Sequence, residues 1–138
     1  MGHAKKDAQF QPLNIALLTV SDTRTLETDG SGDTLQTCLQ GSGHLLADRQ
    51  IRPDDIYQLR AVVSDWIARD NVQVVLVTGG TGFTVRDNTP EALLPLFDKT
   101  IEGYGELFRQ LSHAEIGTST IQSRAIAGVS GLPGEYAM

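Results

Sequence analysis

Apolar runs of strand length alternate with segments of helical periodicity, and this alternation restricts the fold more than any other feature of the chain. Residues 13–20, LNIALLTV, are almost continuously apolar, and residues 72–78, VQVVLVT, repeat the pattern. A weaker strand is expected at residues 44–51. Continuous apolar strands are typical of parallel sheets that are covered on both faces. We therefore predict an α/β fold, a three-layer sandwich with a mostly parallel central sheet flanked by helices.

Helical periodicity follows the predicted strands. The clearest helix should open at Pro53 and Asp54, because apolar residues from Ile56 to Ile67 recur on one face. Residues 102–113 predict another helix with an apolar stripe. The remaining expectations are a helix from Asp33 to about Gly41, a helix capped by Thr89 with Pro90 at its first position, and a helix over residues 119–129 that enters a final strand.

The size of the chain suits one globular domain. It has 138 residues, of which 40% are hydrophobic, enough for a single core. We assign this domain to residues 13–138 and interpret residues 1–12 as a mobile leader, since MGHAKKDAQFQP has charge but no apolar segment. No apolar run approaches the roughly 20 residues that a membrane helix needs. The sequence therefore argues against a membrane protein.

Charge and cysteine content narrow the function further. The net charge is −6 and the pI is about 4.9, which argues against general binding to nucleic acid or acidic membranes, because such binding needs a broad basic face. The single cysteine, Cys38, excludes an internal disulfide and a thiolate zinc cluster. We expect it to be a buried thiol on a helix, in keeping with a reducing cytoplasm. Because the chain as a whole is acidic, an anionic ligand needs a local site with positive charge or hydrogen-bond donors.

Three polar loops should meet at one edge of the predicted sheet. SDTRTLETDGSGD, RPDD and TGGTGFTVRDN each follow a predicted strand, and ligands of open parallel sheets collect beyond the carboxyl ends of the strands. In the third loop Gly79, Gly80 and Gly82 allow successive N–H groups to converge on a phosphate or a similar oxygen group. The loop matches neither a Walker A motif nor a dinucleotide fingerprint. A plain turn remains an equally good interpretation of the glycines alone.

Carboxylates gather at the same predicted edge. The aspartates concerned are Asp22, Asp29, Asp33, Asp54 and Asp87. Acidic groups beside an anion site suggest a bridging Mg²⁺. Helix caps and turns explain most of these aspartates equally well, with Asp87 the one that lacks an obvious structural task. A histidine metal site is not indicated, because the three histidines are far apart in the sequence.

The order of these motifs resembles the MoaB/MogA family of molybdenum cofactor biosynthesis proteins. LLTVSDTR, DGSGD, VVLVTGGTGFTVRDNTPEA, EGYGELFRQLS and TIQSRAIAG carry the resemblance, from residue 13 to about residue 129. It implies a domain that binds molybdopterin, a pterin with a terminal phosphate, and that in catalytic members adenylylates this phosphate with ATP and Mg²⁺. It also implies a homo-oligomer, a trimer or a hexamer. Residues 102–121, with Tyr104, Leu107, Phe108 and Leu111, either contribute to that interface or pack into the chain's own core.

The resemblance also implies roles for individual residues. Asp54 and Asp87 match functional aspartates of the family and are expected to act in catalysis and as Mg²⁺ ligands. Arg86 is expected to neutralise phosphate charge. The substrate-binding residues implied are Thr78, Gly79, Gly80, Thr81, Gly82, Ser21, Asp22, Ser31 and Arg86. Glu106 and the pair Ser123–Arg124 match further family positions without a defined role.

The sequence after about residue 129 departs from the family pattern. There the family continues with an apolar strand, a PGS-like loop and a helix, whereas this chain has SGLPGEYAM. We therefore expect the terminal strand and helix to be missing or altered, which weakens the expectation of catalysis. A pterin-binding carrier or scaffold without transferase activity is the alternative, and a generic nucleotide-binding α/β domain is the third interpretation.

Overall fold

The central sheet of the computed structural model has three parallel strands in the order β2-β1-β3. They are β1 (Asn14–Val20), β2 (Leu45–Arg52) and β3 (Val74–Thr78). The structure describes residues 8–131. Because β1 lies in the middle, it pairs with a neighbour on both edges. The predicted parallel sheet is confirmed.

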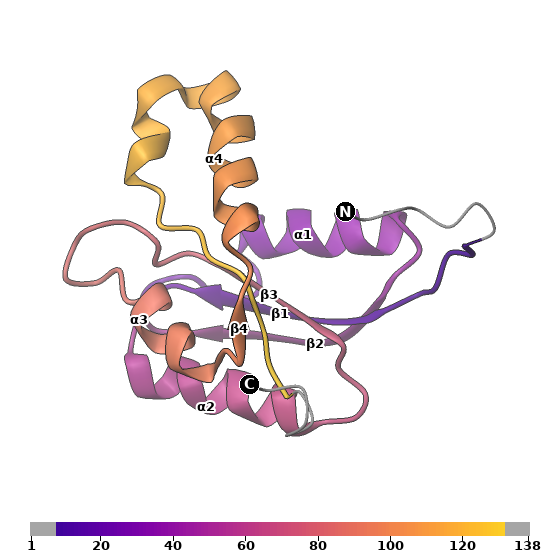
Figure 1. The fold of residues 1–138 in the computed structure, drawn as a ribbon. Coiled ribbons are helices and arrows are strands. Elements are labelled where there is room, and N and C mark those ends of the chain that lie inside the picture. Colours follow the sequence, from indigo (N-terminus) through magenta and orange to yellow (C-terminus); the bar gives the residue numbers. More distant parts are fainter. Residues whose placement is uncertain (1–7, 132–138) are drawn as a thin grey trace.

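Helices cover both faces of this sheet (Figure 1). They are α1 (Gly30–Gly41), α2 (Ile56–Ala68) and α3 (Thr89–Leu93). On one face, Leu39 of α1 packs with Ile15 and Leu17. On the other face, α2 and α3 pack with Ala16 and Leu18. Since side chains alternate along a strand, neighbouring residues of β1 enter different cores, which confirms the three-layer sandwich.

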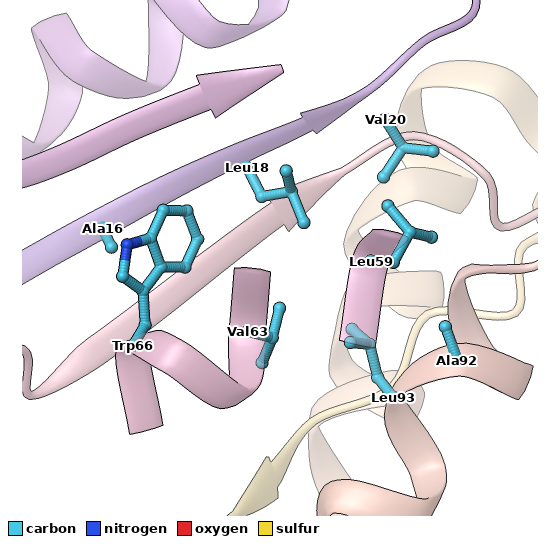
Figure 2. Close-up of a cluster of buried hydrophobic side chains, with 8 residues drawn as sticks. All are labelled: Ala16, Leu18, Val20, Leu59, Val63, Trp66, Ala92 and Leu93. Atoms are coloured by element: carbon cyan, nitrogen blue, oxygen red, sulfur yellow. The ribbon is translucent and has the colours of Figure 1, made fainter. Parts of the chain in front are cut away.

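The larger core lies between β1 and α2 (Figure 2). Leu59, Val63 and Trp66 follow the helical spacing that the sequence predicted, and Trp66 is 1% exposed. Its indole Nε1–H donates to Asp48 Oδ2 at 3.0 Å, so the buried ring keeps a polar partner. Burial of each large apolar side chain in this cluster stabilises the fold by about 1.5–3 kcal/mol. These contacts fix the two layers that support the site.

The carboxyl ends of the strands form one edge of the sheet. In the register of the ladder, Thr19 pairs with Thr78, and Val20 pairs with Arg52. The loops that follow β1, β2 and β3 therefore leave the sheet side by side. This arrangement agrees with the predicted meeting of the three polar loops.

The first two helices begin at residues other than those expected. α1 begins after Asp29, whose carboxylate accepts the N–H of Gly32, so the expected start at Asp33 is wrong. The glycines between them are poor helix formers, and only the capping contact reveals the earlier start. Asp55, not Asp54, caps α2, because it accepts the N–H groups of Tyr57 and Gln58. Asp54 is thereby left for another role.

The third helix also begins differently. Asn88 occupies the position before α3, and Thr89 is its first residue, with Pro90 in the first turn as expected. The Thr89 hydroxyl donates to the Gly79 carbonyl at 2.7 Å instead of capping the helix. The expected cap at Thr89 is therefore wrong, because its side chain serves a contact with the preceding loop.

A helical arm follows the sheet region and projects from it (Figure 1). It consists of α4 (Glu102–Ile116) and the 3₁₀ helix η2 (Gly117–Gln122). Gly117 ends α4 with a φ of 65°. The helix expected over residues 119–129 is thus replaced by η2, an extended segment and the short β5 (Gly128–Val129). β5 pairs antiparallel with β4 (Lys99–Thr100), and η1 (Leu94–Leu96) follows α3.

The burial of two helices decides one open alternative and overturns one expectation. The stripe of α4 does not pack inward, since all four of its apolar side chains are between 42% and 64% exposed. They are Tyr104, Leu107, Phe108 and Leu111. Cys38 is exposed on α1, where Leu39 takes the inward position. In both helices the periodicity predicts a helix, but the face that meets the core depends on how the helix is placed on the sheet.

Residues 1–7 and 132–138 lie outside the described part of the chain. Most of the leader assigned to residues 1–12 falls there, as does most of the C-terminal segment expected to depart from the family pattern. Among residues 8–131, no helix combines the length and apolar character that crossing a membrane requires.

Candidate functional site

The glycine loop, residues 79–88, connects β3 to α3 at the carboxyl edge of the sheet. Gly79 and Gly80 have φ values of 102° and 71°, which side chains with a Cβ adopt only with strain. A Cβ on Gly80 would lie 2.3 Å from Thr89 Oγ1 and 2.7 Å from Asp54 Oδ2. The missing side chain therefore lets the backbone of this loop lie directly on Asp54 and Thr89.

Several N–H groups of this loop are available to a ligand. Within residues 8–131, the N–H groups of Gly80, Thr81 and Phe83 donate no hydrogen bond to the protein. Gly82 lies against Asp87, and a Cβ there would be 2.8 Å from Asp87 Oδ2. A run of N–H groups without protein acceptors is the arrangement that binds phosphate oxygens. The loop thus has donors beyond those that a plain turn uses.

Asp54 is a buried carboxylate behind the glycine loop. It is 5% exposed and accepts the N–H of Asn88 at 3.1 Å and 3.3 Å. Burial raises its pKa, Asn88 lowers it in part, and the negative charge of Asp87 raises it further. The Asp54 carboxylate thus lies against the start of the glycine loop, within the electrostatic influence of Asp87.

Asp87 has a structural task that the sequence did not reveal. Its Oδ2 accepts the Thr84 N–H at 3.0 Å and the Thr84 hydroxyl at 2.7 Å, which closes the tip of the glycine loop. These hydrogen bonds from Thr84 lower the pKa of Asp87, so it is a carboxylate at neutral pH. The expectation that Asp87 lacks a structural task is therefore wrong, although the rest of its carboxylate remains available.

An ion pair joins the first loop to the glycine loop. Arg86 Nε donates to Asp22 Oδ2 at 3.0 Å, and its Nη2 donates to Asp22 Oδ1 at 2.7 Å. Asp22 Oδ1 also accepts the Asp54 N–H at 3.0 Å. The pair is bidentate but well exposed, so it contributes little to stability on its own. Arg86, expected to meet phosphate, is engaged by a carboxylate in this structure.

The other aspartates form a separate network under α1. Asp29 is fully buried and accepts from Arg49 Nη2 at 3.0 Å and from the Thr19 hydroxyl at 2.7 Å. Arg49 also pairs with Asp33 at 2.9 Å. Burial would raise the pKa of Asp29, but hydrogen bonds from Gly32, Thr19 and Arg49 together lower it. This network holds the start of α1 against β2. Ser31, expected to bind substrate, is exposed in the first turn of α1.

A cavity of about 470 Å³ lies at the ends of β1 and β2. Ser21 and Asp22 line it, together with three arginines, Arg24, Arg49 and Arg52. Arg49 Nε is buried without a hydrogen-bond partner in residues 8–131. Arginines in the lining suit a ligand with negative charge, and Arg24 and Arg52 are the two that are not already paired with a carboxylate in residues 8–131. The cavity borders Asp22 but not the glycines, so it offers a second compartment beside the loop.

Arg124 is the main site residue to which the sequence assigned no role. It follows η2, and its Nε and Nη2 donate to the carbonyls of Gly82 and Asp87 at 2.7 Å and 2.6 Å. Its guanidinium also lies 5.3 Å from the centre of the exposed Phe83 ring. The contacts join residues about forty positions apart, and no local pattern signals them. Only its place in the motif QSRAIAG could have drawn attention to it.

The residues present fit a divalent cation that arrives with a ligand. In residues 8–131, no three or more His, Cys, Asp or Glu side chains converge on a metal position. Asp54 lies against Gly80 and Asp87 against Gly82, so the glycine loop has a carboxylate near each of these residues. Mg²⁺ in nucleotide sites is bound by one or two carboxylates plus phosphate oxygens and water. The donor set therefore suits Mg²⁺ held jointly with phosphates.

Known proteins share both the sequence and the fold. The family model described as "Probable molybdopterin binding domain" matches residues 16–138. Molybdenum cofactor biosynthesis protein B of Escherichia coli is 55% identical over 130 residues, which cover 94% of this chain and 76% of that protein. A crystal structure of a molybdenum cofactor biosynthesis protein B aligns with a TM-score of 0.84 at 44% identity, over 88% of this chain and 76% of the other. The tungsten cofactor synthesizing protein MoaB from Pyrococcus furiosus aligns with a TM-score of 0.77 at 33% identity, over 90% and 77%.

Proposed function

The chain belongs to the molybdopterin-binding domain family of molybdenum cofactor biosynthesis proteins, and from this premise we propose that it binds molybdopterin and adenylylates its terminal phosphate with ATP and Mg²⁺. The observation that supports this most is the glycine loop, whose N–H groups at Gly80, Thr81 and Phe83 have no acceptor in residues 8–131. Beside them lie the carboxylates Asp54 and Asp87. Donors for an anion next to ligands for a cation are what phosphoryl transfer needs.

Molybdopterin is held by its terminal phosphate in this proposal. The N–H groups of the loop donate to phosphate oxygens, and Thr78 and Gly79 bring the chain from β3 into the loop. The exposed rings and methyl groups of Phe83 and Val85 lie on the same loop, where they offer apolar surface. The loop thus combines polar and apolar groups for a pterin that carries a phosphate.

ATP takes the neighbouring cavity. Its phosphates are anionic, and Arg24, Arg49 and Arg52 line that cavity next to Ser21. Asp54 and Asp87 are the residues that would hold Mg²⁺, and the bound ion would neutralise charge on the phosphates. The ion pair of Asp22 with Arg86 lies between the two compartments, since Asp22 lines the cavity and Arg86 belongs to the loop.

The transfer requires no covalent intermediate with the protein. An oxygen of the molybdopterin phosphate forms a bond to the α-phosphorus of ATP, and the bond from that phosphorus to the β-phosphate oxygen breaks, which releases pyrophosphate. The protein orients the two anions and keeps them in contact, and this positioning supplies most of the rate acceleration. The apolar surface of Phe83 and Val85 and the charged groups of the loop thus belong to one proposed site. We also propose that the protein is cytoplasmic.

A pterin carrier without transferase activity is the second candidate. The bidentate pair of Arg86 with Asp22 favours it, because the arginine of the loop is already neutralised and does not face a phosphate. Binding through the loop N–H groups needs no arginine. The two candidates thus share the molybdopterin site and differ in what happens to ATP.

Incubation of the protein with molybdopterin, ATP and Mg²⁺ separates the candidates. Our proposal expects adenylylated molybdopterin and pyrophosphate in equal amounts, and none of either without Mg²⁺. Binding of molybdopterin without pyrophosphate release identifies a carrier. Absence of molybdopterin binding contradicts both.

We also propose that the protein assembles as a homo-oligomer, a trimer or a hexamer, through the helical arm. Tyr104, Leu107, Phe108 and Leu111 form an exposed apolar stripe on α4, and Ile121 of η2 is 75% exposed. Contiguous exposed apolar surface of this kind is typical of protein interfaces. Because the arm projects from the sheet region, its stripe is accessible to another copy (Figure 1).

A further inference from the structure

Arg124 connects the segment after η2 to three carbonyl groups of the glycine loop region. Its backbone N–H donates to the Thr81 carbonyl at 3.0 Å. Its side chain donates to the carbonyls of Gly82 and Asp87 at 2.7 Å and 2.6 Å. All three acceptors are main-chain oxygens, so these contacts constrain the backbone of the loop rather than its side chains.

The direction of these carbonyls sets the direction of the neighbouring N–H groups. In a planar trans peptide, the carbonyl of one residue and the N–H of the next point in opposite directions, and the described residues contain no cis peptide. Carbonyls of Thr81 and Gly82 that face Arg124 therefore aim the N–H groups of Gly82 and Phe83 away from it. The Gly82 N–H donates to Asp87, whereas the Phe83 N–H has no acceptor in residues 8–131. The Asp87 carbonyl shows the same relation, because the following Asn88 N–H reaches Asp54 at 3.1 Å.

Glu91 holds Arg124 in the orientation that these contacts need. Glu91 Oε2 lies 2.5 Å from Arg124 Nη1, and its Oε1 lies 3.1 Å from Nη2. The guanidinium is 24% exposed, and its rigid fork meets two carbonyls and one carboxylate at once. A lysine at this position cannot reach all three acceptors, since it has a single ammonium group.

We propose that Arg124 is a positioning residue, which orders residues 82–88 of the glycine loop and aims the Phe83 N–H at the ligand without touching the ligand itself. The identity of that ligand, molybdopterin, rests on the function proposed above. The loop has no regular secondary structure between Gly79 and Asn88, so its donors depend on side-chain contacts to keep their direction. Preorganised donors bind a phosphate more tightly than donors that must first be ordered.

Arg60 provides a matched control. From α2 it donates to the carbonyls of Glu91 and Ala92, both at 2.9 Å, so it too is a partly buried arginine that holds main-chain carbonyls of this region. It makes no hydrogen bond to residues 79–88. A loss of general stability affects the Arg60→Ala and Arg124→Ala variants alike, whereas a loss of loop order affects only Arg124→Ala.

Two measurements test the proposal on the full chain. Amide hydrogen exchange of the free protein should be about tenfold faster or more at residues 82–88 in Arg124→Ala, and unchanged there in Arg60→Ala. Titration with molybdopterin should show affinity lower by about tenfold or more in Arg124→Ala, and within about twofold of wild type in Arg60→Ala. Arg124→Lys should retain the charge but not the loop order, and should therefore resemble Arg124→Ala in exchange.

The contrary outcomes are distinct. Exchange at residues 82–88 that stays at the wild-type rate in Arg124→Ala overturns the proposal, as does equal weakening by Arg60→Ala. If wild type itself does not bind molybdopterin, the proposed function fails, and exchange in the free protein still decides the role of Arg124.

Discussion

Asp54 lies behind the glycine loop, Asp87 belongs to it, and the two carboxylates are held in different ways. Asp54 is buried, and burial raises its pKa, whereas hydrogen bonds from Thr84 lower the pKa of the accessible Asp87. Two carboxylates near each other with opposite shifts are frequent in catalytic sites. Substitution of Asp87 tests the proposed adenylyl transfer better than substitution of Asp54 does, because it disturbs less buried structure.

We expect Asp87→Asn to lower the rate of adenylyl transfer by about a hundredfold or more, because a charged ligand of the Mg²⁺–phosphate complex is lost. The asparagine carbonyl still accepts the hydrogen bonds of Thr84, so the loop should keep its shape. Affinity for molybdopterin should remain within about threefold of wild type. Steady-state pyrophosphate release and titration measure the two quantities, with exposed Asp65→Asn as the charge control. Equal rates in Asp87→Asn and wild type contradict the assigned role.

Gly80 is a poor position at which to test ligand binding by substitution. A Cβ at Gly80 points at Thr89 and Asp54, inside the protein, and not at the side from which a ligand would approach the N–H groups. Any side chain at this position also meets a φ of 71°. Loss of binding in such a variant therefore reports distortion of the loop and cannot identify a ligand.

At the scale of elements, α4 has the apolar face of a buried helix, but that face is exposed to solvent in the single chain. Its apolar side chains recur at helical spacing, as they do in a buried helix, but they remain exposed in the single chain. α2 has the same kind of stripe, and there Leu59, Val63 and Trp66 are buried against the sheet. The difference lies in position, since α4 begins beyond the sheet and extends away from it (Figure 1).

We expect Leu111→Lys to weaken the proposed homo-oligomer, because it places a charge at the most exposed residue of the stripe, which is 64% exposed. Gln110→Lys is the control, since it adds the same charge to an exposed neighbour that lies off the stripe. Light scattering at low concentration should show a smaller mean mass for Leu111→Lys alone, with unchanged circular dichroism. A wild-type protein that is a stable monomer rules out assembly, and an unchanged mass for Leu111→Lys places the interface elsewhere.

At the scale of the whole molecule, carboxylates link stability to pH. Hydrogen bonds and ion pairs lower the pKa of Asp22, Asp29, Asp87 and Glu91 in the folded chain. A lowered pKa means that the group stabilises the fold above its unfolded pKa, about 4, and that this contribution is lost as the pH falls through the folded pKa. Asp54 acts in the opposite direction, because its pKa is raised. The lowered groups are more numerous, so acid should destabilise the fold.

Asp29→Asn tests this link, because Asp29 is fully buried and joins β1, α1 and β2. At pH 7 we expect it to lower the free energy of unfolding by about 3 kcal/mol, since the charge on Arg49 loses a buried partner. The difference from wild type should shrink as the pH falls from about 4, the pKa of the unfolded aspartate, through the lower pKa of folded Asp29. Urea unfolding from pH 7 to pH 3 measures both, with Asp65→Asn as an exposed control. A difference that does not depend on pH contradicts the assignment.

Features that depend on neighbouring residues could be predicted from the sequence. The strands at residues 13–20 and 72–78, the helix with Leu59 and Trp66, and the three-layer α/β fold follow from apolar periodicity, which is a property of a local stretch. The glycine loop was recognisable for the same reason, because positive φ and close backbone approach require glycine at Gly79 and Gly80.

The roles of individual polar residues were decided by the tertiary structure. Adjacent Asp54 and Asp55 are equivalent as candidate caps, and only the folded chain shows one on α2 and the other behind the glycine loop. Asp22 and Arg86 are 64 positions apart, and Arg124 is 42 positions from Gly82. Such contacts depend on strand register and on the paths of several loops, and these are set by the packing of the whole core rather than by any short stretch of sequence.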